Sequence, residues 1–373
     1  MPIIQSELLS NSSSISVIVD DVEILSISKL TYTQTINAAR VANFDVGSLE
    51  DSLKCRIGAK ITILVGRVPT NVNTVIKGTS LTSPVNFTNY YHFEGIVRQV
   101  NPTANGATVA AYDYVSLLKT STYVEYKKED VLGRDLYTLI ADAANVTEID
   151  TTNLLGGIGI LATEKMQLTG FKTRKEFIDL CILNSISLVS DSTKYKDSLN
   201  PIYWQYAIRS QNVFDLFKLD PSNVHNKPVL KISLDSNNVY NITPLINTQR
   251  LVNSITIVNT GKEFSFTITD ESSANQYGVS SQLITTTETA REQIETAAYE
   301  LIGRYNKPTI TYNVELTNTD CFCLGDYVEV TSNIVGTSLL PIQKITTNFT
   351  DGLTILSLGE KELSVQEMIK LIK

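Results

Sequence analysis

Residues 252–278, VNSITIVNTGKEFSFTITDESSANQYG, hold two strand-like runs and then a polar stretch. Both VNSITIVN and EFSFTIT alternate apolar with polar side chains, which is typical of β-strands with one buried face. The polar stretch that ends at Gly278 packs two acids, two serines and a tyrosine before a helix-like run. We interpret it as a corner where Asp270 and Ser272 hydrogen-bond to backbone groups and Gly278 adopts a positive φ. A catalytic site and a contact point with a partner are the alternatives.

The helix that follows this corner is the clearest secondary-structure signal in the chain. Residues of about 287–305 carry apolar side chains along one stripe, threonines precede the helix, and Pro308 lies beyond its end. Strand-like runs surround the helix from residue 229 onward. We therefore expect a C-terminal β-barrel over 229–373 that contains one long amphipathic helix. The stripe consists of Ala290, Ile294, Ala297, Ala298, Leu301 and Ile302.

Residues 1–125 form a second group of short strand-like runs. SISVIVDDVEILSISKLTYTQTI alternates around a turn at Asp20–Asp21, and ANFDVG, AKITILVGR, YYHFEGIVRQVNP and GATVAAYDYVSLL follow it. About six short strands at this spacing favour a barrel or a sandwich. We expect an N-terminal β-barrel over 1–125, with a polar, turn-rich insertion at about 69–90.

The period changes in residues 126–228. VLGRDLYTLIADAAN places apolar residues at helical spacing, and FKTRKEFIDLC begins with a capping box made by Thr173 and Glu176. Each helix runs into a strand-like piece, which predicts a small mixed α/β domain with two helix-strand units. The expected fold is therefore mainly β with an α+β middle: two β-barrel domains flanking a small mixed α/β domain. The predicted apolar face of the first helix consists of Leu132, Leu136, Leu139, Ile140 and Ala143.

Charge and hydropathy argue against several classes of protein. The 373 residues carry a net charge of −8, and most of the acidic excess lies after residue 240, which argues against binding to a nucleic-acid backbone. The chain has no apolar run of about 18 residues, so we expect no membrane insertion. Its start lacks a signal-peptide pattern. Its four cysteines do not form a disulfide framework, so we expect synthesis in a reducing cytoplasm.

Candidate chemical sites are few. The two histidines, His92 and His225, have no second ligand at metal-binding spacing. We interpret the CFC motif at Cys321–Cys323 as small buried hydrophobic residues rather than a redox or metal site. LLGGIGIL at 154–161 lacks the phosphate-loop pattern and is interpreted as a connector. The sequence therefore predicts no catalytic residue, no cofactor and no metal, and the chain is not expected to be an enzyme.

The order of the motifs in the last third resembles the final domain of tail-hub (baseplate hub) proteins of tailed phages and related contractile injection systems. The family pattern is an N-x-I/V-x-V strand, an acidic and serine-bearing turn ending in Tyr-Gly, a helix, a Gly-Asp-x-Val strand and a closing hairpin. The first third and the middle, including GRDLYTLIADAA and TRKEFIDLC, look like the opening barrel and middle domain of the same family. The matching residues are Asn253, Ile255, Ile257, Ser272, Tyr277, Gly278, Gly325, Asp326, Val328, Ile342, Ile345, Leu356, Leu358 and Gly359.

The resemblance implies a homotrimer in which each chain contributes two similar barrels. Six barrels then form a pseudo-sixfold ring on the hexameric tail tube, and the threefold symmetry matches a trimeric spike or fibre. The implied partners are the tail tube or distal tail protein, the spike or fibre, and the tape measure protein. DNA passes through the lumen without specific binding, and an acidic wall would repel its phosphates; the alternative is that the acids only keep an exposed surface soluble. The expected location is the tail tip of the virion, after assembly in the host cytoplasm.

Two other functions compete with this interpretation. The first is a β-rich carbohydrate- or receptor-binding tail module, in which exposed tyrosines would cluster as platforms for sugars. The second is a tail-associated cell-wall hydrolase.

Overall fold

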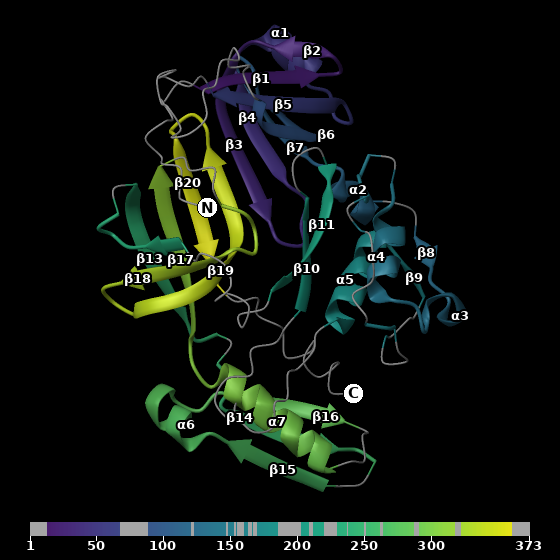
Figure 1. Cartoon of the computed structure of the whole chain (residues 1–373), viewed down its shortest axis with the longest axis vertical. Coiled ribbons are helices and arrows are strands. Elements are labelled where there is room, and N and C mark those ends of the chain that lie inside the picture. Colours follow the sequence, from purple (N-terminus) through teal and green to yellow (C-terminus); the bar gives the residue numbers. More distant parts are fainter. Residues whose placement is uncertain are drawn as a thin grey trace, which may run out of the picture.

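The fold is mainly β, as the sequence predicts (Figure 1). Its described residues bury four hydrophobic clusters. Among these residues no helix combines the length and the apolar surface needed to cross a membrane. The computed structural model describes residues 13–67, 89–120, 123–146, 148–152, 154, 160–162, 166, 170–185, 203–208, 212–219, 230–236, 238–249, 251–261, 264–286, 291–317 and 322–359.

The N-terminal strands lie in the order β3-β4-β7-β6-β5-β1-β2, and every neighbouring pair is antiparallel. Their inward-facing residues, including the fully buried Phe44 and Phe93, form one hydrophobic cluster. The elements are β1 (Ser13–Val19), β2 (Val22–Ile24), β3 (Ile27–Thr35), β4 (Val41–Val46), α1 (Leu49–Lys54), β5 (Lys60–Arg67), β6 (Asn89–Pro102), β7 (Ala107–Tyr112) and α2 (Val115–Thr120).

The C-terminal strands continue the same sheet. Their order is β13-β17-β20-β19, β18 pairs with the first part of β19, and β12 pairs with β18 in the parallel direction. These strands enclose a second cluster that includes Tyr312 and Val330. The elements are β12 (Leu230–Ile232), β13 (Val239–Asn247), β17 (Thr309–Thr317), β18 (Tyr327–Ser332), β19 (Gly336–Asn348) and β20 (Leu353–Leu358).

The two expected barrels are not separate bodies, because β3 and β19 pair with each other and join both groups into one sheet. Within the described chain the hydrogen-bonded strands follow an open path, and no closed barrel is present. In the N-terminal group the ladder stops at Leu25–Ser26, where the chain bends between β2 and β3. The two strands are consecutive in the chain but pair with β1 and β4, at opposite ends of that group.

The long predicted helix belongs to a separate small unit instead of the C-terminal barrel. A three-stranded sheet, ordered β15-β14-β16, buries its own apolar cluster against α7, and in Figure 1 this unit lies apart from the large sheet. We call residues 251–307 the inserted module, because they lie between β13 and β17. The predicted stripe is buried at Ile294, Ala298, Leu301 and Ile302, while residues 287–290 lie outside the described chain. The elements are β14 (Ser254–Asn259), β15 (Phe264–Thr269), α6 (Glu271–Tyr277), β16 (Ser281–Thr286) and α7 (Arg291–Tyr305).

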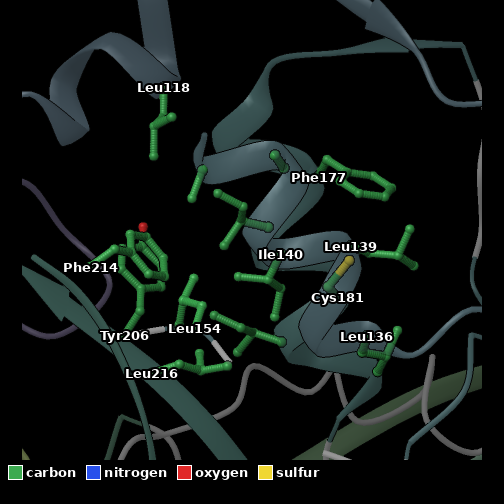
Figure 2. Packing of buried hydrophobic residues seen from close by; sticks show 14 of the residues in the cluster. Leu118, Leu136, Leu139, Ile140, Leu154, Phe177, Cys181, Tyr206, Phe214 and Leu216 are labelled. Atoms are coloured by element: carbon green, nitrogen blue, oxygen red, sulfur yellow. The ribbon is translucent and has the colours of Figure 1, made fainter. Parts of the chain in front are cut away.

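The middle of the chain packs two helices against a β-hairpin (Figure 2). The predicted capping box is present at the start of α5, where Thr173 and Glu176 bond to each other's backbone N–H. Leu132 ends α3 instead of joining the apolar face of α4. The elements are β8 (Val124–Glu125), α3 (Lys128–Val131), α4 (Leu136–Ala144), β9 (Phe171–Lys172), α5 (Arg174–Asn184), β10 (Tyr203–Ile208) and β11 (Phe214–Leu219).

The β10–β11 hairpin contributes to two cores. Tyr206 and Phe214 stack at 4.9 Å between ring centroids and face the helices in Figure 2. Ala207 and Leu219 belong to the core of the C-terminal strands instead. Because alternate residues of a strand point to opposite sides, one hairpin ties the helical region to the large sheet.

Several sequence predictions lie wholly or mainly outside the described chain. They include the polar insertion at about 69–90, of which only the last two residues are described as the start of β6, and the connector at 154–161. His225 and Cys321 are also outside it.

Candidate assembly site: a repeated pair of sheet halves

The large sheet contains the same five-strand unit twice. We call β3, β4, β5, β6 and β7 the first half, and β13, β17, β18, β19 and β20 the second half. In space the halves run β3-β4-β7-β6-β5 and β13-β17-β20-β19-β18, and every neighbouring pair is antiparallel. The corresponding strands also follow one another in the same chain order. The two halves therefore have one topology.

The β-bulges of the two halves coincide. Ser28 is the extra residue in the β3–β4 ladder, and Tyr240 is the extra residue in the β13–β17 ladder. Arg98 bulges in the β6–β7 ladder, and Gln343 bulges at the same place in the β19–β20 ladder. A bulge shifts the register by one residue, so matched bulges align the halves residue by residue. The alignment matches 27–35 with 239–247, 41–46 with 311–316, 60–65 with 327–332, 97–102 with 342–347, and 107–111 with 354–358.

A glycine turn is repeated at the start of β5 and β18. Gly58 has φ 89° and Gly325 has φ 85°, in the left-handed region that favours glycine. The N–H of Gly58 donates to the carbonyl of Val97 at 2.8 Å, and that of Gly325 donates to the carbonyl of Ile342 at 2.9 Å. In each half a bond runs back to the carbonyl of the residue after the glycine, at 3.0 and 2.9 Å. The φ angle, the pattern of hydrogen bonds and their lengths agree between the two turns, so the turn belongs to the repeat.

The buried side chains correspond as well. Matched strands direct alternate apolar residues into the N-terminal and C-terminal clusters, respectively. The matched buried pairs are Leu30 with Ile242, Phe44 with Val314, Val46 with Leu316, Ile61 with Val328, Ile63 with Val330, Val97 with Ile342, Val109 with Leu356 and Ala111 with Leu358.

The family resemblance implied two similar barrels, but reasoning from the residues did not align the two halves, although one signal for the alignment exists. RIGAKITI at 56–63 and CLGDYVEV at 323–330 share an apolar residue, a glycine and two β-branched residues at the same spacing. Of these two segments, only CLGDYVEV contributed individual residues, Gly325, Asp326 and Val328, to the family resemblance. Elsewhere the matched strands share apolar character but few identical residues, which is the usual condition of a packed β-core.

The contact between the halves is a short antiparallel ladder, which we call the seam. Residues 31–35 of β3 pair with 344–348 of β19, and the hydroxyl oxygens of Thr33 and Thr346 lie 3.3 Å apart. Just beyond the ladder, Ile36 packs into the core of the second half and Phe349 packs against that of the first. At the seam, each half thus packs one apolar side chain against the core of the other half.

The connection between β3 and β4 anchors the middle of the chain. The Arg40 guanidinium donates to the Asp113 carboxylate at 2.9 Å, and both side chains are almost fully buried. Arg40 also donates to Asn212 at 3.0 Å, and Asn212 donates to Glu94 at 2.8 Å. Burial raises the pKa of Asp113, and the charge of Arg40 opposes that shift. This network joins the first half to Asn212, two residues before β11.

The corner predicted at 267–278 contains the short helix α6 and a cluster of hydrogen bonds. Asp270 accepts from the Ser273 N–H at 3.0 Å and from the Asn306 side chain at 2.7 Å. Asn253, which is fully buried, donates to the Ser273 hydroxyl at 3.2 Å and to the Gly278 carbonyl at 2.8 Å. The Ser273 N–H and then the Asn306 amide hold the pKa of Asp270 below its ordinary value. These groups tie β14, α6 and the end of α7 together.

The residues singled out from the sequence fall in two separate places. Asp270 caps the start of α6 and Gly278, with φ 83°, caps its end, as the corner interpretation expects. Ser272 is exposed; its neighbour Ser273, which sequence reasoning passed over, makes the buried contacts. Tyr277 is partly exposed at the end of α6. Gly325 and Asp326 lie far along the chain in the repeated turn.

The structure corrects one interpretation of the cysteines. Cys323 is exposed in the turn before β18, so the interpretation of the CFC motif as buried residues is wrong for that cysteine. The turn leaves its side chain outside the sheet, while Leu324 takes the core position. Among the residues with described positions, no three His, Cys, Asp or Glu side chains lie close enough together to hold a metal ion.

Comparison with known proteins identifies a class of fold. No protein-family model and no curated protein matches the sequence. Solved structures of phage-type tail proteins match it over almost the whole length, so the chain has a tail-protein fold, in agreement with the resemblance stated from the sequence.

Two of these structures carry the comparison. One is the tail protein from Neisseria meningitidis MC58, with a TM-score of 0.56 and 12% identity over 94% of this chain and 97% of that chain. The other is the 43 kDa tail protein of prophage MuSo2 from Shewanella oneidensis, with a TM-score of 0.55 and 13% identity over 96% of this chain and 98% of that chain.

Proposed function

We propose that the chain is a structural tail-hub protein that forms a homotrimer between a hexameric tail tube and a trimeric spike or fibre. The observation that carries the proposal is the collinear repeat of the two sheet halves, with coincident bulges and glycine turns. A chain with two equivalent units lets three subunits present six similar faces. Three copies of a repeat are therefore compatible with sixfold and threefold neighbours at once.

Each half is, in this proposal, one barrel of the hub. Each half packs around an apolar cluster of its own, and in the N-terminal group the strand ladder of the described chain is open between β2 and β3. The fold shared with two tail proteins supports a place in the tail of a virion. In that place the chain acts by assembly rather than catalysis, and its partners are the tube or distal tail protein, the spike or fibre, and the tape measure protein.

The lumen of such a ring must let DNA pass. We propose that acidic residues of the second half and the inserted module contribute to an electronegative wall, because the acidic excess of the chain lies after residue 240. A ring reconstructed with a neutral or basic inner wall would contradict this part of the proposal.

The proposal is tested by the mass of the full chain in solution. Size-exclusion chromatography with light scattering should give about three times the 41.2 kDa of one chain at micromolar concentration. Negative-stain images should then show a ring with six similar densities. A particle of one chain at every concentration tested contradicts the trimer.

A further inference from the structure

Two strand edges in the repeat have a partner in one half and none in the other. In the seam, the outer edge of β3 meets the outer edge of β19. The counterpart of β3 is β13, which among the described residues pairs only with β17. The counterpart of β19 is β6. In the described part of the chain, its residues 99–102 pair only with β7. Among the described residues, the edges that match the two sides of the seam therefore both lack a strand partner.

We propose that β13 of one copy lies against β6 of the next copy and reproduces the seam between chains. This inference rests on the proposed trimer and specifies the surface through which it forms. In one chain the two open edges stand at different places in the strand order β13-β17-β20-β19-β3-β4-β7-β6. Seven strand spacings separate them, roughly 34 Å along the sheet, and within the described chain the two edges do not pair with each other.

A second copy is the occupant that fits, because the two edges are different surfaces. A contact between unlike surfaces is repeated by each subunit in turn and closes a ring when the rotation allows. The seam already shows that edges of these two types pair in this protein. The seam within each chain and the contact between chains would then alternate around the ring.

The residue alignment predicts the register of the new contact. Thr33 of the seam corresponds to Leu245, and Thr346 corresponds to Asn101. In the same way the seam pair Gln34–Ile345 becomes Ile246 of one copy and Val100 of the next. The contact is therefore expected to pair 243–247 of β13 with 99–103 around the end of β6.

The exposed side chains on β13 agree with this contact. Leu245 is 48% exposed and Ile246 is 57% exposed, whereas their seam counterparts Thr33 and Gln34 are partly covered. Val100 is also only partly buried, while its counterpart Ile345 is 4% exposed. Pairing in the predicted register would place Ile246 beside Val100 and remove both from water.

One rung of the new contact differs from the seam. The bonds from Ile36 to Gln343 and from Phe349 to Leu30 make even-numbered residues of β3 the hydrogen-bonded ones, so Tyr32 lies on such a rung. The aligned residues are Pro244 and Pro102, and neither has an N–H to donate. The contact between copies thus lacks two of the hydrogen bonds of the seam and is expected to be weaker. Proline on an open edge also opposes indiscriminate strand pairing.

The first test places a charge in the contact. Ile246→Asp should shift the trimer towards monomer by at least tenfold in dissociation constant, measured by light scattering over a concentration series. The matched control is Tyr240→Asp, since Tyr240 is on the same strand and 65% exposed but corresponds to Ser28, which lies outside the seam. The control should leave the mass unchanged, and circular dichroism should show both variants folded.

The second test reads the register directly. The aligned positions 101 and 245 form a non-hydrogen-bonded pair, in which side chains approach closely enough for a disulfide. Asn101→Cys with Leu245→Cys should give covalent dimers and trimers on non-reducing gels after mild oxidation. The two single variants, which keep the native cysteines, should give no more cross-linked product than the unchanged protein.

The outcomes separate this inference from the proposed function. If the Ile246→Asp variant remains a trimer and the double-cysteine variant does not cross-link, the β13–β6 contact is overturned and the hub proposal still stands. A wild-type chain that stays monomeric, together with a double-cysteine variant that does not cross-link, overturns both. Dissociation by Ile246→Asp and not by Tyr240→Asp, together with cross-linking, supports both.

Discussion

The two halves of the sheet share strands, bulges and a glycine turn, but they differ in what joins their first two strands. In the first half, residues 36–40 connect β3 to β4 and carry Asn37 and Arg40 into buried contacts with the middle of the chain. In the second half, the whole inserted module occupies the same connection. The strand ladders therefore act as a common scaffold, and the first connection is where each half is specialised.

The largest expected effect comes from breaking the first connection. Arg40→Met leaves the Asp113 carboxylate buried without its cation, which should lower the free energy of unfolding by about 3–5 kcal/mol. The matched change Arg56→Met removes an exposed pair with Asp20 at 3.1 Å and should cost no more than about 1 kcal/mol. Urea denaturation of both variants checks the difference. Equal losses would show that the buried network does not hold the first half to the middle.

A smaller effect distinguishes the two glycine turns. Gly58→Ala should cost about 1–2 kcal/mol, because a positive φ strains alanine but its Cβ would meet no atom within 4 Å. Gly325→Ala has the same backbone strain, and its Cβ would lie 2.4 Å from the Phe217 ring, which should add about 1–3 kcal/mol. Thermal unfolding of the two variants gives the comparison directly. A larger loss at Gly58 would mean that the β10–β11 hairpin does not pack on the second turn.

The inserted module can be weakened on its own. Asn253→Ala removes donors to Ser273 and the Gly278 carbonyl and leaves buried groups unpaired, at a cost of about 1–3 kcal/mol. Hydrogen exchange should speed up in β14, α6 and α7 but not in the first half. Ser272→Ala, one residue from the cluster and exposed, serves as the control and should leave exchange unchanged. Faster exchange throughout the sheet would show that the module is not an independent unit.

The smallest effect is a pH dependence in the same module. Because hydrogen bonds lower the pKa of Asp270 in the folded state, its stabilising contribution is present above the ordinary value of 3.8. It is lost as the pH falls through the lower folded value. The difference in melting temperature between the unchanged protein and Asp270→Asn should therefore shrink between pH 6 and pH 3. A difference that is constant over this range would show that the carboxylate charge does not matter there.

The sequence predicted the kinds of elements better than their arrangement. Alternation identified most strands, and the stripe through Ile294 and Leu301 identified α7, because each signal is local and periodic. The capping box at Thr173 was also visible, since it depends on residues three positions apart.

What the sequence did not predict depends on contacts between distant residues. The seam, which merges the two expected barrels into one sheet, joins β3 to β19 through mostly polar side chains that carry no pairing signal. The separation of the inserted module also escaped detection, because β14 and β15 have the same pattern as strands of the large sheet. At the corner, Ser272 and Ser273 are identical in type, and only the direction of the α6 helix decides which one is buried.

The seam also bears on how the chain is made. Thr33 and Thr346 stand 313 positions apart, so at ribosomal speeds β3 waits roughly 15 to 60 s for the strand that completes it. Throughout that interval β3 is an unpaired edge strand of the nascent first half, and such an edge can pair with strands of other chains and cause aggregation. Thr31, Thr33 and Thr35 make this edge more hydrophilic than the Leu245–Ile246 edge of β13, which leaves the ribosome later. The edge whose partner strand must still be synthesised is thus the more hydrophilic of the two.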